Sequence, residues 1–208
     1  MGRCMIIAPL YRGEEKAWLT AGEGDLLMCA DGGWAAALRH GLKPSVIVGD
    51  FDSMPEPEAP GAEIIRLPVH KDDTDMVACL REGRKRGYRS FILAGCMGGR
   101  FDHTISNLQC LYDCAARGEE AWMCDGQNRV TVLLPGTYRL PAMPDRKLSL
   151  LAFGQDARGV TVTGVEWPLE GATLTCRHPL GCSNEFRAAE ASLSFTDGAL
   201  IVAYCKDL

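Results

Sequence analysis

The sequence lacks the signatures of metal-knuckle, secreted and membrane-spanning proteins. Its ten cysteines include no Cys-x-x-Cys pair, and its four histidines show no zinc-type spacing with them, which argues against a structural zinc site. Residues 1–10 carry one arginine and a short apolar run broken by Pro9, too brief for a signal peptide or a membrane span. These absences predict a cytoplasmic protein without a membrane partner.

Other absences narrow the class of ligand. The formal net charge is -5, and the basic residues are scattered apart from Arg81 to Arg89, which argues against nucleic-acid binding and favours a small-molecule substrate. No solenoid repeat or low-complexity tract occurs. With 208 residues, of which 47% are hydrophobic and 24% charged, the chain has the composition of a packed globular protein with one large domain or two modest ones.

Strand-like apolar runs alternate with helical stretches through residues 1–124. Continuous apolar runs are typical of strands buried on both faces, so this rhythm predicts an α/β domain with a mostly parallel sheet. In the helical stretch after residue 100, Ile105, Leu108, Leu111 or Tyr112, and Ala115 predict one apolar face. The predicted strands are Cys4–Ala8, Asp25–Ala30, Ser45–Val48, Glu63–Leu67, Ser90–Ala94 and Ala121–Cys124.

From residue 125 the pattern changes to short alternating or β-branched segments separated by glycine and proline. Such spacing is typical of an all-β sandwich or barrel, so we expect a second domain, a β-sandwich, over residues 125–208. Its predicted strands are Arg129–Leu134, Lys147–Phe153, Gly159–Val165, Ala172–Cys176, Ala191–Phe195 and Leu200–Tyr204.

Two acidic clusters directly follow predicted strands of the first domain. Asp31-Gly32-Gly33 is either a ligand site at the carboxyl edge of the sheet or a tight turn with a capping aspartate. Asp50 and Asp52 follow the next strand, and period-two alternation would point both to one side if the extended geometry persists. Like charges in a small space favour a divalent cation such as Mg²⁺; the competing interpretation is a solvated surface loop.

The third cluster, Lys71-Asp72-Asp73-Thr74-Asp75, precedes a helical run. Helix capping by Asp73 or Thr74 explains part of this acidity without catalysis. Metal ligation by Asp75 and a phosphate contact from Lys71 would explain the remainder.

The fourth cluster joins a glycine-rich strand exit, Gly98-Gly99, to Arg100, Asp102 and His103 at a helix start. It lacks the Gly-Lys-Ser/Thr of a P-loop, yet the glycines can admit a polyphosphate and the planar arginine fork can grip its oxygens. Asp102 can reach a metal or orient a nucleophile. For His103 a packing role competes with that of a general base, and Asn107 shares its helix face.

In this order the four clusters resemble the thiamine pyrophosphokinase family. Two downstream segments, Thr163 to Leu169 and Ser183-Asn184-Glu185-Phe186, are similar to that family's thiamine-domain motifs. The resemblance therefore spans nearly the whole chain. Cys96-Met97 departs from the small or aliphatic residues familiar there, and Trp167 occupies a position that often carries Tyr in bacterial members.

The resemblance implies specific roles for the matching residues and a homodimer with active sites between subunits. Trp167, Ser183 and Asn184 would meet thiamine, although Trp167 as sandwich core competes with stacking. The implied set divides into catalytic residues Asp50, Asp52, Asp75, Arg100 and Asp102, of which the four aspartates also bind Mg²⁺, and ATP-binding residues Asp31, Gly32, Gly33, Lys71, Asp72, Thr74, Gly98, Gly99, His103 and Asn107.

The implied reaction transfers pyrophosphate from ATP to thiamine, giving thiamine diphosphate and AMP. The residues alone leave two alternatives open. One is a Mg²⁺-dependent phosphohydrolase or nucleotidyl-type transferase that uses the same carboxylates on another acceptor. The other is a nucleotide or thiamine sensor without turnover, which would have little need for so many uncompensated charges.

Overall fold

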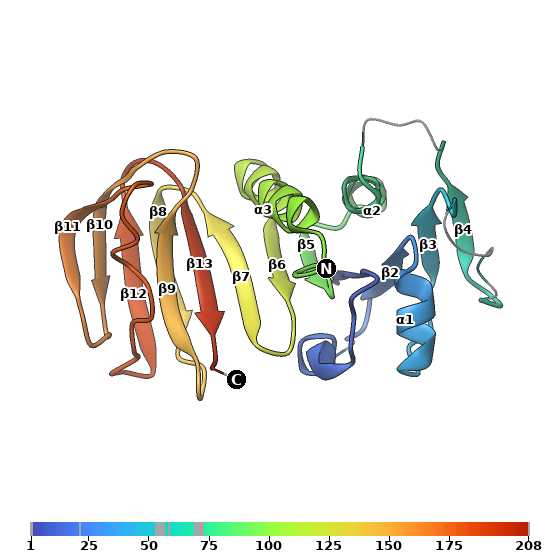
Figure 1. Cartoon of the computed structure of the whole chain (residues 1–208), viewed down its shortest axis with the longest axis horizontal. Helices are drawn as coiled ribbons and strands as arrows, with labels where there is room; N and C mark the ends of the chain where they lie inside the picture. Colours follow the sequence, from blue (N-terminus) through green and yellow to red (C-terminus); the bar gives the residue numbers. More distant parts are fainter. Residues whose placement is uncertain (1, 21, 53–56, 58, 69–72, 208) are drawn as a thin grey trace. The chain divides into compact units, whose positions relative to one another are not determined.

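The computed structural model describes residues 2–20, 22–52, 57, 59–68 and 73–207. The chain divides into two compact units, Met1–Gly126 and Gln127–Leu208. Figure 1 shows helices with strands in the first unit and strands in the second. The predicted fold class, α/β followed by all-β, is confirmed. Each predicted strand is present, with ends that shift by at most three residues.

The first unit is built on parallel strands in the order β4-β3-β2-β1-β5-β6. The chain leaves β1 towards β4 and returns on the other side of β1 with β5 and β6, which creates a topological switch point between β1 and β5. The elements are β1 (Cys4–Ile7), η1 (Glu14–Trp18), β2 (Leu26–Ala30), α1 (Gly33–Arg39), β3 (Val46–Gly49), β4 (Glu63–Arg66), α2 (Asp75–Lys85), β5 (Ser90–Ala94), α3 (Phe101–Ala116) and β6 (Glu120–Cys124).

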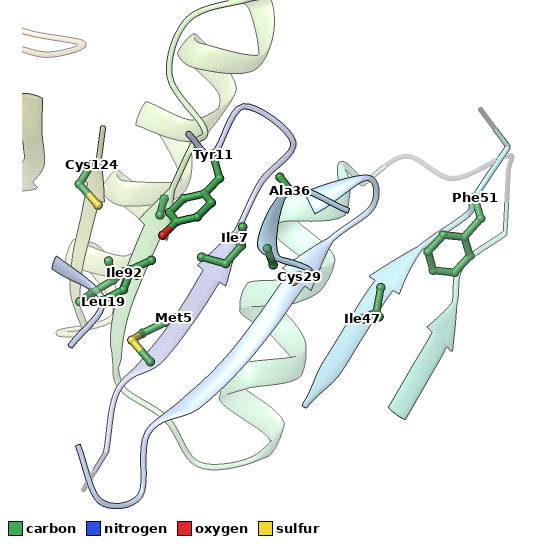
Figure 2. Packing of buried hydrophobic residues seen from close by; sticks show 12 residues of the cluster. Met5, Ile7, Tyr11, Leu19, Cys29, Ala36, Ile47, Phe51, Ile92 and Cys124 are labelled. Carbon is green, nitrogen blue, oxygen red and sulfur yellow. The ribbon is translucent and has the colours of Figure 1, made fainter. Parts of the chain in front are cut away.

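Helices cover both faces of the central strands. On one face, Met5 and Ile7 of β1 share a buried cluster with Ala36 of α1, visible in Figure 2. On the other, Gly83 of α2 packs so closely on Cys4 and Phe91 that an added Cβ would lie 2.8 Å from the Phe91 ring. Because successive strand residues point to opposite faces, burial on both sides requires the continuous apolar runs seen in the sequence.

The buried face of α3 differs from the predicted one. Its buried residues are Asn107, Cys110, Leu111 and Cys114, whereas Ile105 and Tyr112 are exposed. The helix packs against β6 and α2, where small thiol and amide side chains permit a close approach. Leu111 belongs to both the predicted and the buried face; the prediction was wrong for Ile105 and Tyr112 because an apolarity count gives Ile and Tyr more weight than Cys and Asn.

The strands of the second unit pair antiparallel in the orders β7-β13-β9 and β11-β10-β12-β8, and the latter four form a sheet of their own. Alternate residues are buried, as in β12, where Ala191, Leu193 and Phe195 are buried and their neighbours are not. The strands are β7 (Asn128–Leu133), β8 (Gly136–Pro141), β9 (Lys147–Ala152), β10 (Ala157–Thr163), β11 (Leu169–Leu174), β12 (Glu190–Phe195) and β13 (Leu200–Cys205).

The sequence interpretation missed strand β8. It pairs antiparallel with β12, with Tyr138 opposite Leu193. Its ends are glycine and proline and Leu140 is its one buried residue, so it carries almost no apolar signal. The short helix η1 was missed as well.

The cysteines divide between the two units by burial. All ten are free thiols. The seven in the first unit are buried, as their apolar surroundings predicted, whereas Cys176 and Cys182 are exposed and Cys205 is half-buried in the second unit. Burial raises the pKa of the Cys4 and Cys29 thiols to about 12. Among the described residues, no helix is both long and apolar enough to cross a membrane.

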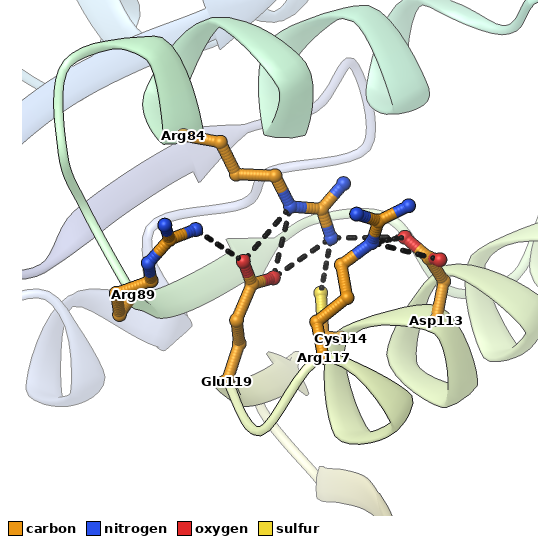
Figure 3. A network of polar contacts seen from close by, with 6 residues as sticks. All are labelled: Arg84, Arg89, Asp113, Cys114, Arg117 and Glu119. Carbon is orange, nitrogen blue, oxygen red and sulfur yellow. Dashed lines mark hydrogen bonds and ion pairs between the residues drawn. The ribbon is translucent and has the colours of Figure 1, made fainter.

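A buried carboxylate ties α2 and α3 together at the edge opposite the strand exits. The Glu119 side chain has no exposed surface and accepts hydrogen bonds from Arg84 Nε at 2.9 and 3.1 Å and from Arg89 Nη1 at 2.9 Å (Figure 3). Arg84 also contacts Asp113 Oδ2 at 3.0 Å and Cys114 Sγ at 3.3 Å. A buried charge with several charge-assisted partners fixes geometry at the cost of desolvation.

Glu119→Gln should destabilise the protein by about 2 kcal/mol, because it removes the buried one of the two carboxylates that pair with Arg84 and leaves Asp113 as its remaining counter-charge. Urea denaturation measures the change. The matched control is Arg117→Gln, which breaks the exposed ion pair with Asp113 and should cost less than about 0.5 kcal/mol. Equal effects from both variants would contradict a special role for the buried carboxylate.

Candidate active site

A cleft of about 280 Å³ opens in the first unit, where the strands β1, β2 and β5 end. Ligands of open α/β sheets bind at this edge, beside the switch point. The cleft is lined by Ala8, Pro9, Leu10, Ala30, Asp31, Thr74, Asp75, Met76, Gly95, Cys96, Gly98, Gly99, Arg100, His103, Ser106 and Asn107. Side chains from three of the four sequence clusters therefore meet in one place.

Asp31 is the most perturbed carboxyl group of the cleft. It follows β2 with a φ of 41°, and among the described residues its buried Oδ1 has no hydrogen-bond partner. Burial raises the pKa of this carboxyl group, the Gly32 amide lowers it, and the negative charges of Asp75, Asp50 and Asp52 raise it again. The charges of three carboxylates, from the exit of β3 and the start of α2, thus act on Asp31.

A glycine brings the exits of β2 and β3 together. A Cβ at Gly49 would lie 2.9 Å from Asp31 Cα and 3.1 Å from Asp31 Oδ1, so any larger residue would push the two strand ends apart. This close approach explains why Asp50, the next residue along the chain, influences Asp31.

The relation between Asp50 and Asp52 differs from the extended one considered above. Strand β3 ends at Gly49, and Phe51 has a φ of 55°, a left-handed conformation that is rare for a non-glycine residue. The Asp52 backbone N–H donates to Asp50 Oδ1 at 3.3 Å. The two carboxylates are therefore arranged by a turn, not by strand alternation, with Phe51 buried between them in the sequence.

The third cluster combines capping with cleft lining. Thr74 is the N-cap of α2 and its side chain accepts from the Val77 N–H at 3.3 Å. Asp73 forms an ion pair with Arg81, which leaves Asp75, the first helical residue, as the acidic side chain that lines the cleft. Lys71 and Asp72 lie outside the described residues.

In the fourth cluster, Gly98 and Gly99 have φ values of 82° and 62° and line the cleft with Arg100 and His103. Arg100 Nη2 contacts Asp102 Oδ2 at 2.6 Å, and both side chains are exposed. The bond to Arg100 lowers the pKa of Asp102. Asp102 itself does not line the cleft.

Asn107, one turn further along α3, is buried, and its Nδ2 donates to the Cys96 carbonyl at 2.8 Å. The amide thus holds the loop that forms one wall. The sequence interpretation missed Pro9, Leu10, Met76 and Ser106 as further wall residues. Pro9 and Leu10 directly follow the predicted strand Cys4–Ala8. The rule that ligands bind at the carboxyl ends of parallel strands could therefore have identified them.

The three predicted thiamine residues belong to the second unit. Trp167 is 58% exposed, which contradicts the sandwich-core alternative. Asn184 accepts from the Trp167 N–H at 3.1 Å and donates to the Trp167 carbonyl at 2.8 Å. Ser183 has a φ of 58°, and its N–H donates to Ser149 Oγ at 3.0 Å. Both ends of the Asn184 side-chain amide are therefore bonded to the Trp167 backbone, and its Oδ1 also accepts from the Glu185 N–H at 2.9 Å.

Within the described ranges, no group of three or more His, Cys, Asp or Glu side chains is placed so that it could hold a metal ion. The donor chemistry nevertheless suits a hard divalent cation. The buried Oδ1 of Asp31 has no hydrogen-bond partner among the described residues, and three other carboxylates act on the Asp31 charge; carboxylate oxygens are ligands that Mg²⁺ prefers.

Together these features define a protein with an α/β unit, an acidic switch-point cleft suited to a cation-bound phosphate, and an all-β unit. Residues 18–123 match the family model "Thiamin pyrophosphokinase, catalytic domain". Residues 137–200 match "Thiamin pyrophosphokinase, vitamin B1 binding domain". The chain belongs to the thiamin pyrophosphokinase family, and its activity is that of a thiamine diphosphokinase.

Individual relatives agree over nearly the full length. A thiamine pyrophosphokinase of Bacillus subtilis is 29% identical over 191 residues, which cover 89% of each chain. A crystal structure of thiamine pyrophosphokinase from Bacillus subtilis has a TM-score of 0.89 at 28% identity and covers 99% of this chain and 100% of that one. One from Geobacillus thermodenitrificans has a TM-score of 0.87 at 27% identity, covering 99% and 98%.

The crowding of carboxylates around Asp31 predicts a gain in stability when its charge is removed. Folding raises the pKa of the Asp31 carboxyl group. The protein therefore loses stability as the pH rises from the unfolded-state pKa of this group through its folded-state pKa. In EDTA at pH 7, Asp31→Asn should therefore be more stable than the wild type by about 1 kcal/mol. The difference should shrink as the pH falls and Asp31 becomes protonated.

Urea unfolding at pH 7 and pH 4 measures this difference. Asp207→Asn, which removes an exposed carboxylate far along the chain, is the matched control and should change little at either pH. An Asp31→Asn protein no more stable than the wild type at pH 7 would show that the convergent charges carry no cost.

Proposed function

We propose that this chain makes thiamine diphosphate and AMP from thiamine and ATP at the switch-point cleft of its first unit. The observation that carries the proposal is that Asp31 and Asp75 line one cleft at the strand exits, with Asp50 following Gly49, which packs against Asp31. A binding module has no need to hold four carboxylates against their repulsion, whereas an enzyme that handles a cation-bound polyphosphate does.

The residues proposed to hold Mg²⁺ are Asp50, Asp52 and Asp75, with Asp102 as a further ligand. When bound, the cation neutralises charge on the β- and γ-phosphates. Asp31, which lines the cleft and whose Oδ1 has no hydrogen-bond partner among the described residues, is proposed to add to the negative potential that attracts the cation. The oxygen-only donor set favours Mg²⁺ over softer metals.

The phosphates are proposed to lie along Gly98, Gly99 and Arg100. With no Cβ, the two glycines let the chain carry its backbone N–H groups close to a phosphate. Arg100 is exposed and bonds to the exposed Asp102 carboxylate, so its fork can turn towards phosphate oxygens at small cost. Lys71 and Asp72 are proposed to add contacts from the strand-exit side, and Gly32 and Gly33 to admit the ligand beside Asp31.

In the transfer step, the primary alcohol of thiamine attacks the β-phosphorus of ATP, the β–α bridging bond breaks, and AMP leaves. We propose that Asp75 accepts or directs the proton that the alcohol of thiamine loses. Asp75 lines the cleft, whereas Asp102 does not. His103 and Asn107 support the wall of the site. Positioning supplies most of the acceleration.

Thiamine is proposed to stack on the exposed indole of Trp167 and to bond with Ser183. Because the Asn184 amide already bonds with the Trp167 backbone at both ends, its proposed role is to present the indole instead of contacting the pyrimidine. Aromatic faces suit thiamine, whose rings are flat and carry positive charge.

An omission assay tests the reaction. Purified protein should release AMP only when thiamine, ATP and Mg²⁺ are all present. Asp52→Asn should abolish turnover in a folded protein, and Trp167→Ala should raise KM for thiamine roughly tenfold while KM for ATP stays unchanged. AMP release without thiamine would support the hydrolase alternative. Binding of both ligands without product would support the sensor.

We further propose a homodimer with active sites between subunits. Helix α3 exposes Phe101, Ile105 and Tyr112, an apolar stripe at helical spacing on one side of the cleft's own helix. Sedimentation equilibrium should give twice the chain mass of 22.6 kDa, and Ile105→Asp should reduce it to the monomer. A monomeric wild type would contradict the assignment.

A cytoplasmic location is also proposed. Ten free thiols, with none paired, are typical of a reducing compartment. Recovery of the protein from a non-cytoplasmic cell fraction would contradict it.

A further inference from the structure

The loop between β5 and α3 forms one wall of the cleft through Gly95, Cys96, Gly98 and Gly99. Gly98 adopts a φ of 82°, and a Cβ added there would meet nothing within 4 Å. The glycine is therefore required by backbone conformation and not by crowding. Because no packing holds this residue on its Cβ side, the loop depends on polar contacts to keep one conformation.

Two residues of α3, Thr104 and Asn107, supply those polar contacts. Asn107 lines the cleft, whereas Thr104 does not. The Thr104 hydroxyl accepts from the Gly98 N–H at 3.2 Å and donates to the Gly98 carbonyl at 3.4 Å. One hydroxyl has a donor and two acceptor sites, so both bonds are compatible. Three residues along the same helix face, Asn107 binds the Cys96 carbonyl. Helix α3 thus grips the loop at two points.

The two contacts matter for the orientation of the backbone N–H groups at the start of α3. Its N-cap residue, Arg100, has no side-chain capping bond, and of the first-turn amides the His103 N–H is taken by Asp102 Oδ1 at 2.9 Å. The backbone groups between Gly98 and the helix start are therefore aimed by the loop conformation alone. Whatever fixes the peptide planes around Gly98 also fixes the direction in which Gly99 and Arg100 present their N–H groups.

We propose that Thr104 is a positioning residue for nucleotide binding: its hydroxyl fixes the two peptide groups of Gly98 and so pre-organises the phosphate-facing loop. This rests on the proposed function, in which the ATP phosphates lie along Gly98 to Arg100. Without the hydroxyl the glycines sample other φ and ψ values, and the nucleotide must order the loop as it binds. Thiamine, held elsewhere, is not affected.

The test compares Thr104→Val, which keeps the branched shape and removes the hydroxyl, with Thr104→Ser, which keeps the hydroxyl. Thr104→Val should raise the Kd for Mg·ATP, measured by isothermal titration, about fivefold and KM for ATP similarly, with KM for thiamine unchanged within about twofold. Thr104→Ser should restore wild-type values. Thr137→Val, on β8 of the second unit, makes the same chemical change as a control and should leave all constants unchanged.

Thermal unfolding of each variant separates positioning from a general loss of structure, and Thr104→Ala replaces Thr104→Val if the latter does not fold. Equal Mg·ATP affinity in Thr104→Val and wild type would overturn the inference. Failure of Thr104→Ser to restore binding would overturn it too, because the effect would then belong to side-chain shape. A wild type that binds Mg·ATP but does not convert thiamine would defeat the proposed function, while the binding comparison would still decide the role of Thr104.

Discussion

The repulsion among carboxylates at the switch point is the constraint on which the remaining architecture depends. Asp31 follows β2, Asp50 and Asp52 follow β3, and Asp75 begins α2. Burial raises the pKa of Asp31, and the charges of the other three carboxylates raise it too. Free in solution such groups would separate. The parallel sheet prevents this, because its buried strands fix where each exit lies and Gly49 removes the last steric obstacle between two of them.

The parts of the first unit away from the cleft can be understood as the means of resisting that repulsion. Helices on both faces bury the central strands, and Glu119 draws α2 and α3 together through Arg84 at the opposite edge. Both helices begin at the cleft, α2 with Asp75 and α3 beside Arg100. A rigid link at their far ends therefore helps to keep their starts, and the acidic side chains on them, in place.

The sequence predicted the fold class and the convergence of strand exits because both depend on simple periodic signals. Continuous apolar runs identified the parallel strands, and acidic residues directly after them identified the cleft. It could not predict the turn at Asp50 to Asp52, because the left-handed φ of Phe51 has no signature in a residue of that type. Nor could it predict the buried face of α3, where Asn107 and Cys114 pack and Ile105 does not. A residue that acts through hydrogen bonds to the backbone, such as Thr104, carries no pattern of its own and becomes visible only once its partner is placed.

The two units differ in the exposure of their thiols to solvent. Every cysteine of the α/β unit is enclosed, and the thiols that solvent reaches, Cys176, Cys182 and Cys205, all belong to the β unit. A brief reaction with a maleimide dye at neutral pH would consequently mark one half of the folded chain and spare the other. Fluorescence from such a label would report on the half that carries Trp167 without perturbing the acidic cleft.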